Sequence, residues 1–454
     1  MWNLRIFDFR VWMALFLSIA FGFIFLQFIY IFDAKPLFLL ALPVVGVFFV
    51  FLVVKPEWIL ISVVLSRPLL DNLLNSTKTN VGGENIGIGA ILNLVIIILA
   101  VFLTFQYSSF PHHHRSVFYW LVFLFFMLMA SLYSPYVARA IRLFLNYVSY
   151  FAMFLIPFLV IKGKEDFLFW LKIFAWSFIL PVFGANLDLL HGGHYFQDAG
   201  MRISGTFTHP NILAFYLVLG LTFYFYMLKG EYWRSKPGIL WAIRILMLNM
   251  LVLLIATKSR NAWLACISIF LIYGLLKDRK FLIMLFILLP LSLVVPQVQD
   301  RVMTVLQDKE SNNYQGLNSF EWRLQIWKSS LSKIAQRPLQ GYGLTTFKPM
   351  SEQFFSEKSG SGAHNAYLET LFESGIFGFL SFILLLLSPL KMFLNNMFTS
   401  LKPRQARLWA ILAGYMISYM IICFADNLSY YLVLNWYVWF FIGLMLVSER
   451  FSHD

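Results

Sequence analysis

Charged residues are scarce in this 454-residue chain: they make up 13% of it, whereas 60% is hydrophobic. Soluble domains carry about a quarter charged residues, so about half of the usual water-facing side chains are missing. This scarcity excludes a soluble enzyme, a disordered chain and a nucleic-acid-binding module. The mean hydropathy of +0.74 and the 50 Phe and 14 Trp residues, which suit lipid contact and interfacial belts, indicate a polytopic membrane protein.

Cysteine is also scarce. The two cysteines, Cys266 and Cys423, both lie in apolar runs, so the sequence predicts neither a disulfide framework nor a metal site built on them. His191 and His194 lack a Cys or carboxylate partner at zinc-ligand spacing. The first apolar run, 11–32, is long enough to span a membrane and ends without a small-residue cleavage pattern. We therefore expect no bound metal and no cleavable signal peptide.

Apolar runs of membrane-spanning length recur along the chain. A hydrocarbon core of about 30 Å needs about 20 helical residues, and by that criterion the chain holds about fourteen spans. The runs fall near 11–32, 37–54, 57–70, 87–105, 117–134, 141–161, 167–187, 210–228, 238–256, 261–276, 280–296, 365–390, 407–424 and 430–447. The predicted fold is an all-α polytopic transmembrane bundle of about 12 to 14 spans with one long external loop.

The distribution of Lys and Arg predicts the orientation of this bundle. The chain carries a net charge of +13, and cytoplasmic loops of membrane proteins collect basic residues. With Met1 in the cytoplasm, most of the basic loop residues fall on the inside. We therefore expect both termini in the cytoplasm, a bundle of about 11 spans over 1–296, an external loop over 297–363, and about 3 C-terminal spans over 364–454.

The loop 297–363 is the only long polar stretch, and loops of this length are usually functional or disordered. Within it, the segment 319–336 has apolar residues at helical spacing. This stripe is Phe320, Leu324, Trp327, Leu331 and Ile334. The spacing predicts an amphipathic helix with Ser319 as its N-cap, lying on the outer leaflet or closing over a cavity.

His364 is the first candidate catalytic residue. It lies at the end of the external loop and at the start of the next span. An imidazole is the usual side chain for taking a proton from a hydroxyl near neutral pH. Asn365 is a candidate for holding a ring nitrogen or a sugar hydroxyl. Glu369, about one helical turn further on, is a candidate for orienting the imidazole or for acting as the base itself.

Three external arginines form a second set of candidates: Arg202, Arg260 and Arg323. The positive-inside rule disfavours such residues, and each of the three lies in a distinctive local sequence. Arginine grips phosphate oxygens in a bidentate fork, so several guanidinium groups around one outer cavity suit a diphosphate that gains charge as it leaves. A histidine base beside such a clamp predicts glycosyl transfer from a lipid diphosphate.

The assembled motifs resemble the O-antigen ligase and polysaccharide polymerase superfamily of bacterial inner-membrane proteins. The stretches that carry this resemblance are Arg202–Asn211 (RISGTFTHPN), Thr257–Trp263 (TKSRNAW), Trp322–Arg323 with Trp327 and the segment Arg337–Gly343, and Ala363–Glu369 (AHNAYLE) followed by Glu373–Gly378. They cover roughly residues 200–380.

The resemblance implies a metal-independent transmembrane glycosyltransferase that uses no cofactor. Its donor would be a glycan on undecaprenyl diphosphate at the outer face of the bacterial inner membrane, and the lipid bilayer is its other partner. It implies that His364 is the base and that external arginines hold the diphosphate. Arg260 and Arg323 are the first candidates for that role, and Arg202 is the second. Substrate or acceptor contacts are expected from Asn365, Asn211 and Tyr367.

The acceptor separates two enzymes that the motifs do not distinguish. A polymerase would add the growing glycan to the next lipid-linked repeat unit, in some systems with a chain-length regulator as partner, whereas a ligase would add it to lipid A core or another surface acceptor. The number of spans and the stretch 205–211 favour a polymerase. A lipid-linked glycan transporter is the rival from another class, but transporters place ionisable residues at mid-membrane, and these spans carry almost none.

Overall fold

The computed structural model describes most of the chain from residue 51 onward. The described residues are 51–52, 54–81, 84–87, 89–107, 110–111, 114–196, 200–232, 236–292, 294, 299, 321–355 and 360–451. The expected span 11–32, nearly all of 37–54 and the expected N-cap Ser319 lie outside them.

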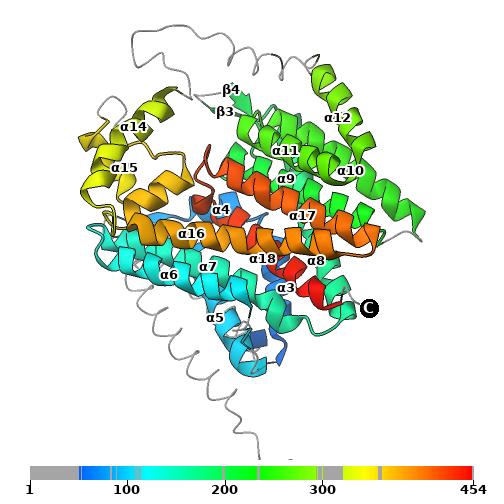
Figure 1. The fold of residues 1–454 in the computed structure, drawn as a ribbon, viewed down its shortest axis with the longest axis horizontal. Helices are drawn as coiled ribbons and strands as arrows, with labels where there is room; N and C mark the ends of the chain where they lie inside the picture. Colours follow the sequence, from blue (N-terminus) through cyan, green and yellow to red (C-terminus); the bar gives the residue numbers. More distant parts are fainter. Residues whose placement is uncertain are drawn as a thin grey trace, which may run out of the picture.

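The described part of the chain is almost entirely helical, and the predicted all-α polytopic bundle is confirmed (Figure 1). Its α-helices are α3 (Pro56–Ser66), α4 (Asp71–Ser76), α5 (Gly89–Tyr107), α6 (Arg115–Leu132), α7 (Val137–Val160), α8 (Lys164–Leu190), α9 (Pro210–Lys229), α10 (Pro237–Ala256), α11 (Arg260–Lys277), α12 (Arg279–Ser292), α14 (Glu321–Gln336), α15 (Phe347–Met350), α16 (Ala366–Thr399), α17 (Pro403–Ile422) and α18 (Leu432–Val447). Short 3-10 helices are η3 (Ser351–Gln353), η5 (Leu428–Tyr430) and η6 (Ser448–Phe451).

Ten helices in the described residues, α5 to α11 and α16 to α18, are long and apolar enough to cross a membrane. One expected span is shorter: the run 57–70 forms the 11-residue α3. A helix of 11 residues rises about 17 Å, less than the hydrocarbon thickness of about 30 Å, so the length criterion overestimated this segment. The run 280–296 falls on α12, and most of its residues after Ser292 lie outside the described part of the chain.

In the described residues, two antiparallel hairpins interrupt the helices, and the sequence pattern does not predict them. They are β1 (Thr79–Val81) with β2 (Glu84–Ile86), and β3 (His194–Phe196) with β4 (Gly200–Arg202). Asp188, near the end of α8, accepts the backbone N–H groups of Ser204 and Gly205 at 2.8 and 2.7 Å. This carboxylate fixes the chain that leaves β4 and leads into α9.

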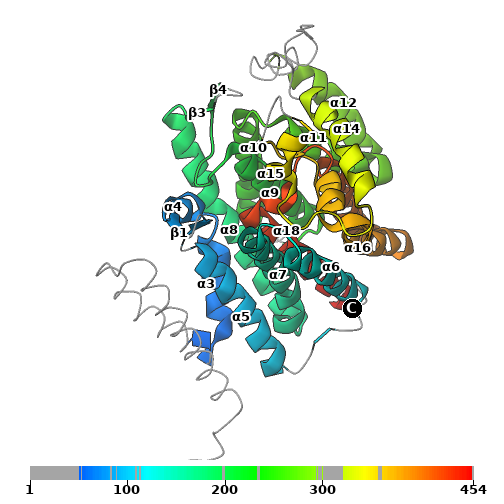
Figure 2. The ribbon, with the colours of Figure 1, turned by 90° about the vertical axis from the view of Figure 1, so that its left-hand side faces the viewer.

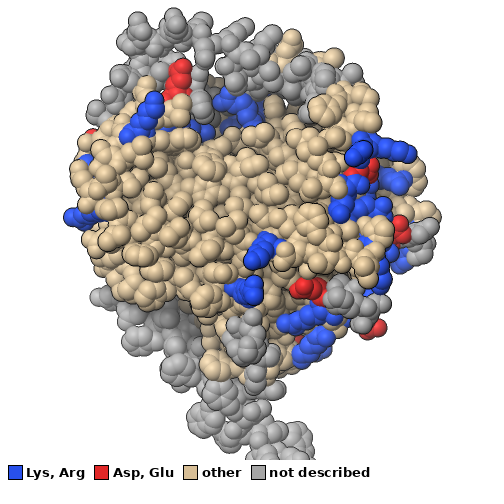
Figure 3. Space-filling model, in the orientation of Figure 1, with Lys and Arg blue, Asp and Glu red and all other residues tan. Residues whose placement is uncertain are grey.

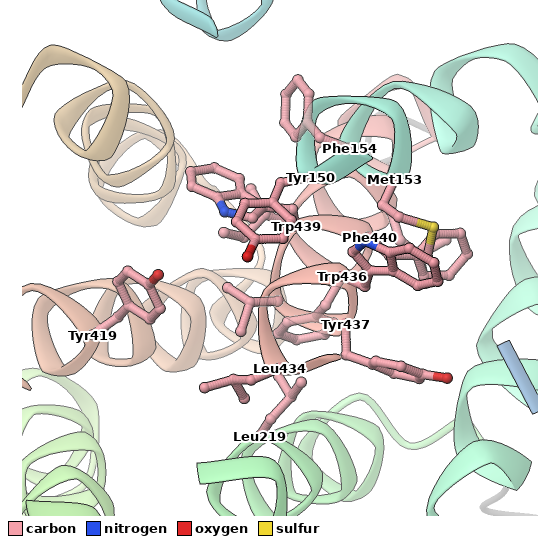
Figure 4. Packing of buried hydrophobic residues seen from close by; sticks show 14 of the residues in the cluster. Tyr150, Met153, Phe154, Leu219, Tyr419, Leu434, Trp436, Tyr437, Trp439 and Phe440 are labelled. Carbon is pink, nitrogen blue, oxygen red and sulfur yellow. The ribbon is translucent and has the colours of Figure 1, made fainter. Parts of the chain in front are cut away.

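The helix α18 forms the centre of the bundle and packs mainly against α7 (Figure 4). A helix that is apolar on all sides is buried on all sides, and every residue from Val433 to Val447 is buried. The ring centroids of Trp120 and Trp439 lie 4.6 Å apart, and the indole N–H of Trp436 donates to Ser149 Oγ at 2.8 Å. The aromatic residues therefore build the interior as well as the lipid-facing surface.

The outer surface of the bundle is apolar over a wide area. Trp241, Ile245 and Leu248 of α10 are more than 60% exposed, which a soluble protein would avoid and a lipid-facing helix favours. Figure 3 shows one face on which most charged side chains lie toward the margins, with a broad uncharged area between them. This distribution fits a protein that crosses a bilayer.

The described end of the long polar loop 297–363 folds around a small core of its own. That core consists of Ile326, Ile334, Tyr342, Phe347, Phe355, Ala363 and Phe372. The predicted amphipathic helix is confirmed as α14, but its inward face is different from the predicted stripe. Leu331 is 54% exposed, whereas Ile326 and Ser330 are fully buried. The small core, which forms between α14 and residues distant in sequence, decides which face of the helix is covered.

The helix α16 contains a break at Gly375, where φ is 67° and ψ is −170°. The loop after α14 packs into this break: Ile376 N donates to Pro338 O at 2.8 Å, and Gly343 N donates to Glu373 O at 2.8 Å. A Cβ at Gly375 would lie 2.2 Å from Leu339 O, so only glycine fits. The break therefore attaches α14 to the membrane bundle.

Candidate active site

The chain between α17 and α18, residues 423–431, is the point at which the candidate residues meet. We call it the α17–α18 turn. Ala366 N, at the start of α16, donates to Cys423 O at 2.8 Å. The Nδ2 of Asn261 in α11 donates to Ala425 O at 3.1 Å, and Nη1 of Arg323 in α14 donates to the same carbonyl at 2.9 Å. Helices distant in sequence are thus tied to one short segment.

His364 lies directly before α16 and faces this turn. Its Nδ1 is 3.8 Å from Oδ1 of Asp426, with 43% of the histidine side chain exposed and 5% of the aspartate side chain. The imidazole also meets the ring of Trp322 edge-on, with centroids 5.5 Å apart. The backbone φ of His364 is 47°, a conformation that non-glycine residues seldom adopt and that recurs at functional sites. An imidazole that is exposed on one side and faces a buried carboxylate is accessible to the hydroxyl group of a substrate.

Asp426 is held by two further side chains. The hydroxyl of Tyr431 donates to its two oxygens at 3.2 and 3.1 Å, and Asn211 Nδ2 donates to Oδ2 at 3.4 Å. These hydrogen bonds stabilise a carboxylate that is only 3% exposed. Asp426 is not among the site residues that the sequence predicts. It is the only acidic residue between Lys402 and Val447, and that isolation in an apolar stretch was the available signal.

Arg202 supports Asn211 from the other side. Its Nη2 donates to Asn211 Oδ1 at 2.8 Å, and its Nε donates to Thr257 O at 2.7 Å in the turn between α10 and α11. The side chain is 4% exposed. A line of contacts therefore runs from Arg202 through Asn211 and Asp426 to His364. The guanidinium of Arg202 uses two of its donors within the protein, so it has fewer left for a diphosphate.

Arg323 contacts the turn, and Arg260 lies near Arg323. Burial lowers the pKa of Arg323, the nearby Asp426 opposes this shift, and the positive charge of Arg260 adds to it. The positive charges of the two guanidinium groups therefore repel each other. The Nε of Arg323 is buried without a hydrogen-bond partner, which is costly unless a ligand supplies an acceptor. Arg260, the first residue of α11, is exposed. Two neighbouring cations, one with an unsatisfied donor, suit an anion.

Glu369 lies below the turn, 4% exposed. Its carboxylate accepts Asn427 Nδ2 at 2.7 Å and the hydroxyl of Tyr430 at 3.0 Å. Both donors come from the α17–α18 turn, and neither was singled out from the sequence. The arrangement orients the turn from beneath and leaves His364 with Asp426 as its adjacent carboxylate.

Asn365 and Tyr367 use their polar atoms within the fold. The side chain of Asn365 caps α16 by accepting Tyr367 N at 3.1 Å and Leu368 N at 3.0 Å. The hydroxyl of Tyr367 donates to Met420 O at 2.8 Å, and its ring packs on Phe424. These contacts fix the start of α16 and with it the position of His364.

Metal-ligating side chains do not gather in the described part of the chain: it holds no group of three or more His, Cys, Asp or Glu residues that could hold an ion. His194 does have a carboxylate partner, since its Nε2 lies 3.3 Å from Asp188 Oδ1. That pair joins β3 to the end of α8.

These features define a polytopic membrane protein with a polar, partly cationic site at one end of its bundle. Residues 245–383 match the family model described as O-antigen ligase. The match supports the resemblance to the O-antigen ligase superfamily over this part of the chain. It includes Arg260, Arg323 and His364, whereas Asn211 and Asp426 lie outside it. A search of curated proteins finds no match.

Proposed function

We propose that the protein is a membrane glycosyltransferase that transfers a glycan from undecaprenyl diphosphate to an acceptor hydroxyl on the outer face of the inner membrane. The observation that supports this most is the convergence on the α17–α18 turn. An exposed imidazole paired with a buried carboxylate lies there together with the neighbouring guanidinium groups of Arg323 and Arg260. The match of residues 245–383 to the O-antigen ligase family model is consistent with this chemistry.

The proposed reaction is a single displacement. The imidazole of His364 takes the proton of the acceptor hydroxyl as its oxygen attacks the anomeric carbon. The bond from that carbon to the diphosphate oxygen breaks, and its electron pair leaves with the diphosphate. Arg323 and Arg260 stabilise the charge that develops there, while Asp426 stabilises the imidazolium. Attack opposite the leaving group inverts the anomeric centre.

For the acceptor, we propose the next lipid-linked repeat unit, which makes the protein a polysaccharide polymerase, with a chain-length regulator as a possible partner. A ligase that uses lipid A core or another surface acceptor is the second candidate, favoured by the description of the matching family model. Purified protein supplied with each acceptor separately distinguishes the two. A ladder of products that grows on a lipid-linked unit identifies a polymerase, and a single transfer to lipid A core identifies a ligase.

Replacement of His364 by Ala tests the reaction itself. General-base catalysis contributes about 10²- to 10⁴-fold, so we expect at least a hundredfold slower transfer of glycan from the lipid diphosphate. His194→Ala is the matched control, because His194 is also an exposed histidine beside a carboxylate but belongs to β3. Normal transfer by the His364 variant would refute the base assignment.

A further inference from the structure

A cavity of about 540 Å³ lies beside the candidate active site. It is enclosed by the end of α3, by α4 and by the starts of α5, α7, α9 and α18. Figure 2 shows α3, α4 and α5 together along one edge of the bundle. Among the described residues, four charged side chains line the cavity: Arg67, Asp71, Lys78 and Arg142. Three cations therefore face one carboxylate.

The carboxylate is already engaged by its neighbours. Asp71 Oδ1 accepts Arg67 Nη1 at 3.2 Å, and Oδ2 accepts the backbone N–H and the hydroxyl of Thr208, both at 3.1 Å. Arg67 is 4% exposed, and its Nε is buried without a hydrogen-bond partner. A buried guanidinium with an unsatisfied donor indicates that an acceptor from a ligand belongs there. The net charge of the lining favours an anion.

Part of the remaining lining is apolar and continues onto the outer surface of the bundle. Ile141 and Leu145 of α7 line the cavity and are each 42% exposed. One helical turn separates them, so they extend an apolar strip from the cationic end of the cavity along the side of α7. A ligand that satisfies both parts carries an anionic group and a long hydrocarbon chain.

The cavity adjoins the candidate active site through two shared segments. Tyr430 lines the cavity, and its hydroxyl donates to Glu369 beneath the α17–α18 turn. Thr208 also lines the cavity, and Asn211, three residues further on, contacts Asp426. A head group in the cavity therefore lies directly behind the turn that carries Asp426.

We propose that this cavity binds the phosphate head group of a lipid, with Arg67, Lys78 and Arg142 facing the phosphate oxygens and the hydrocarbon chain lying along Ile141 and Leu145. Binding does not depend on the proposed reaction. The identity of the lipid does rest on the proposed function: it would be the lipid-linked acceptor, held by its own phosphate while its sugar reaches His364.

Binding of two lipids to the purified full chain tests this proposal. The probes are undecaprenyl phosphate and phosphatidylglycerol, titrated in detergent and followed by native mass spectrometry. Loss of one charge-assisted contact to a phosphate weakens binding by about tenfold or more, so Arg142→Ala and Lys78→Ala should each have this effect. Arg139→Ala is the control, because Arg139 is an exposed cation one turn away on α7 that lies over Tyr136 and outside the cavity lining.

The outcomes separate the sources of the phosphate. Tighter binding of the polyprenyl lipid, lost in both cavity variants, supports the acceptor assignment. Equal binding of both lipids, lost in both variants, supports a lipid-phosphate site and rejects that assignment. Unchanged binding of both lipids in variants whose thermal unfolding matches the parent protein overturns the proposal. His364→Ala should bind both lipids normally, so a failure of the proposed reaction is distinguishable from a failure of this site.

Discussion

The guanidinium of Arg323 reaches the α17–α18 turn from α14, a helix outside the membrane-spanning set. In the Arg323→Lys variant the charge remains, but the planar fork that contacts a carbonyl and an anion together is lost. We expect kcat/KM for the lipid-diphosphate donor to fall by about 10- to 100-fold, the range for a hydrogen bond to a charged group. Steady-state kinetics with varied donor measures this.

Lys328→Ala is the control for that experiment. Lys328 is an exposed residue of the same helix, so its loss should leave donor kinetics unchanged. Wild-type kinetics in Arg323→Lys would contradict a forked contact and leave only a role for the charge.

His114, at the opposite end of the bundle, makes stability depend on pH. Burial, with a smaller effect from Arg450, lowers the pKa of His114 from 6.5 to about 4. Its Nδ1 accepts Ser116 N at 3.3 Å and caps α6, which requires an unprotonated nitrogen. Between these two pKa values the unfolded chain binds the proton and the folded chain does not, so this stabilisation is complete above pH 6.5 and declines toward pH 4.

We therefore expect the protein to lose about 2 kcal/mol of stability between pH 7 and pH 5 through this residue. Thermal unfolding in detergent at the two pH values measures the loss. His114→Asn keeps a capping acceptor that does not titrate, and most of this pH dependence should disappear in it. An equal decline in both proteins would assign the effect to other groups.

At the scale of single residues, the sequence identified site residues that lie in distinctive local motifs. It missed site residues whose role depends on contacts between distant segments of the chain. His364 and Arg323 each lie in a recognisable motif, and both contact the α17–α18 turn. Asp426 lies in a third segment of the chain, and its position beside His364 depends on how α16 packs against α17. Side-chain spacing within one element carries no information about that packing.

At the scale of the elements, the break in α16 at Gly375 positions the loop that follows α14. Gly375→Ala places a Cβ at a φ of 67° and 2.2 Å from Leu339 O. We expect a loss of about 1–3 kcal/mol from backbone strain and a lower rate of transfer, because the loop that docks there carries α14 and Arg323. Thermal unfolding and glycan transfer report the two effects.

Gly238→Ala is the matched control for this substitution. Gly238 lies in the first turn of α10, and a Cβ there meets no atom within 4 Å. Alanine favours helix over glycine by about 1 kcal/mol, so this variant should be as stable as the parent or more so. A Gly375 variant that behaves like the Gly238 variant would exclude strain at the break.

The elements themselves were predictable to different degrees. Long apolar runs identified all ten candidate spans of the described residues, because lipid requires a helix of a set length. The predicted inward face of α14 was wrong at Leu331, because a core that includes residues of the segment 342–372 determines which face of the helix is buried. Each hairpin pairs two strands of three residues, and a strand of that length is too short to show the alternation of apolar and polar residues that predicts a strand.

At the scale of the whole molecule, the orientation of the bundle across the membrane stays a prediction. The native cysteines Cys266 and Cys423 are 7% and 1% exposed, so they provide a low background for labelling. In intact cells a membrane-impermeant maleimide should modify Lys328→Cys in α14. Leu401→Cys, at a position 97% exposed between α16 and α17, should react only after permeabilisation.

Labelling of the position 401 variant in intact cells, with protection of the position 328 variant, would invert the proposed topology and place the candidate active site in the cytoplasm. Composition and charge bias predicted the membrane bundle because both follow from the bilayer as solvent. The spans 11–32 and 37–54 remain predictions, since they lie outside the part of the chain described here, apart from the last residues of the second.

The hydrogen bonds from Asn261 and Arg323 to a single backbone carbonyl, that of Ala425, have a practical consequence for mutagenesis. Every amino acid supplies the same oxygen, so no side-chain replacement at position 425 deletes it. An alanine scan skips the position altogether, because alanine is already there. Mutational mapping will outline the residues around this carbonyl and leave its own contribution invisible, and backbone chemistry such as an amide-to-ester exchange is the route to measuring it.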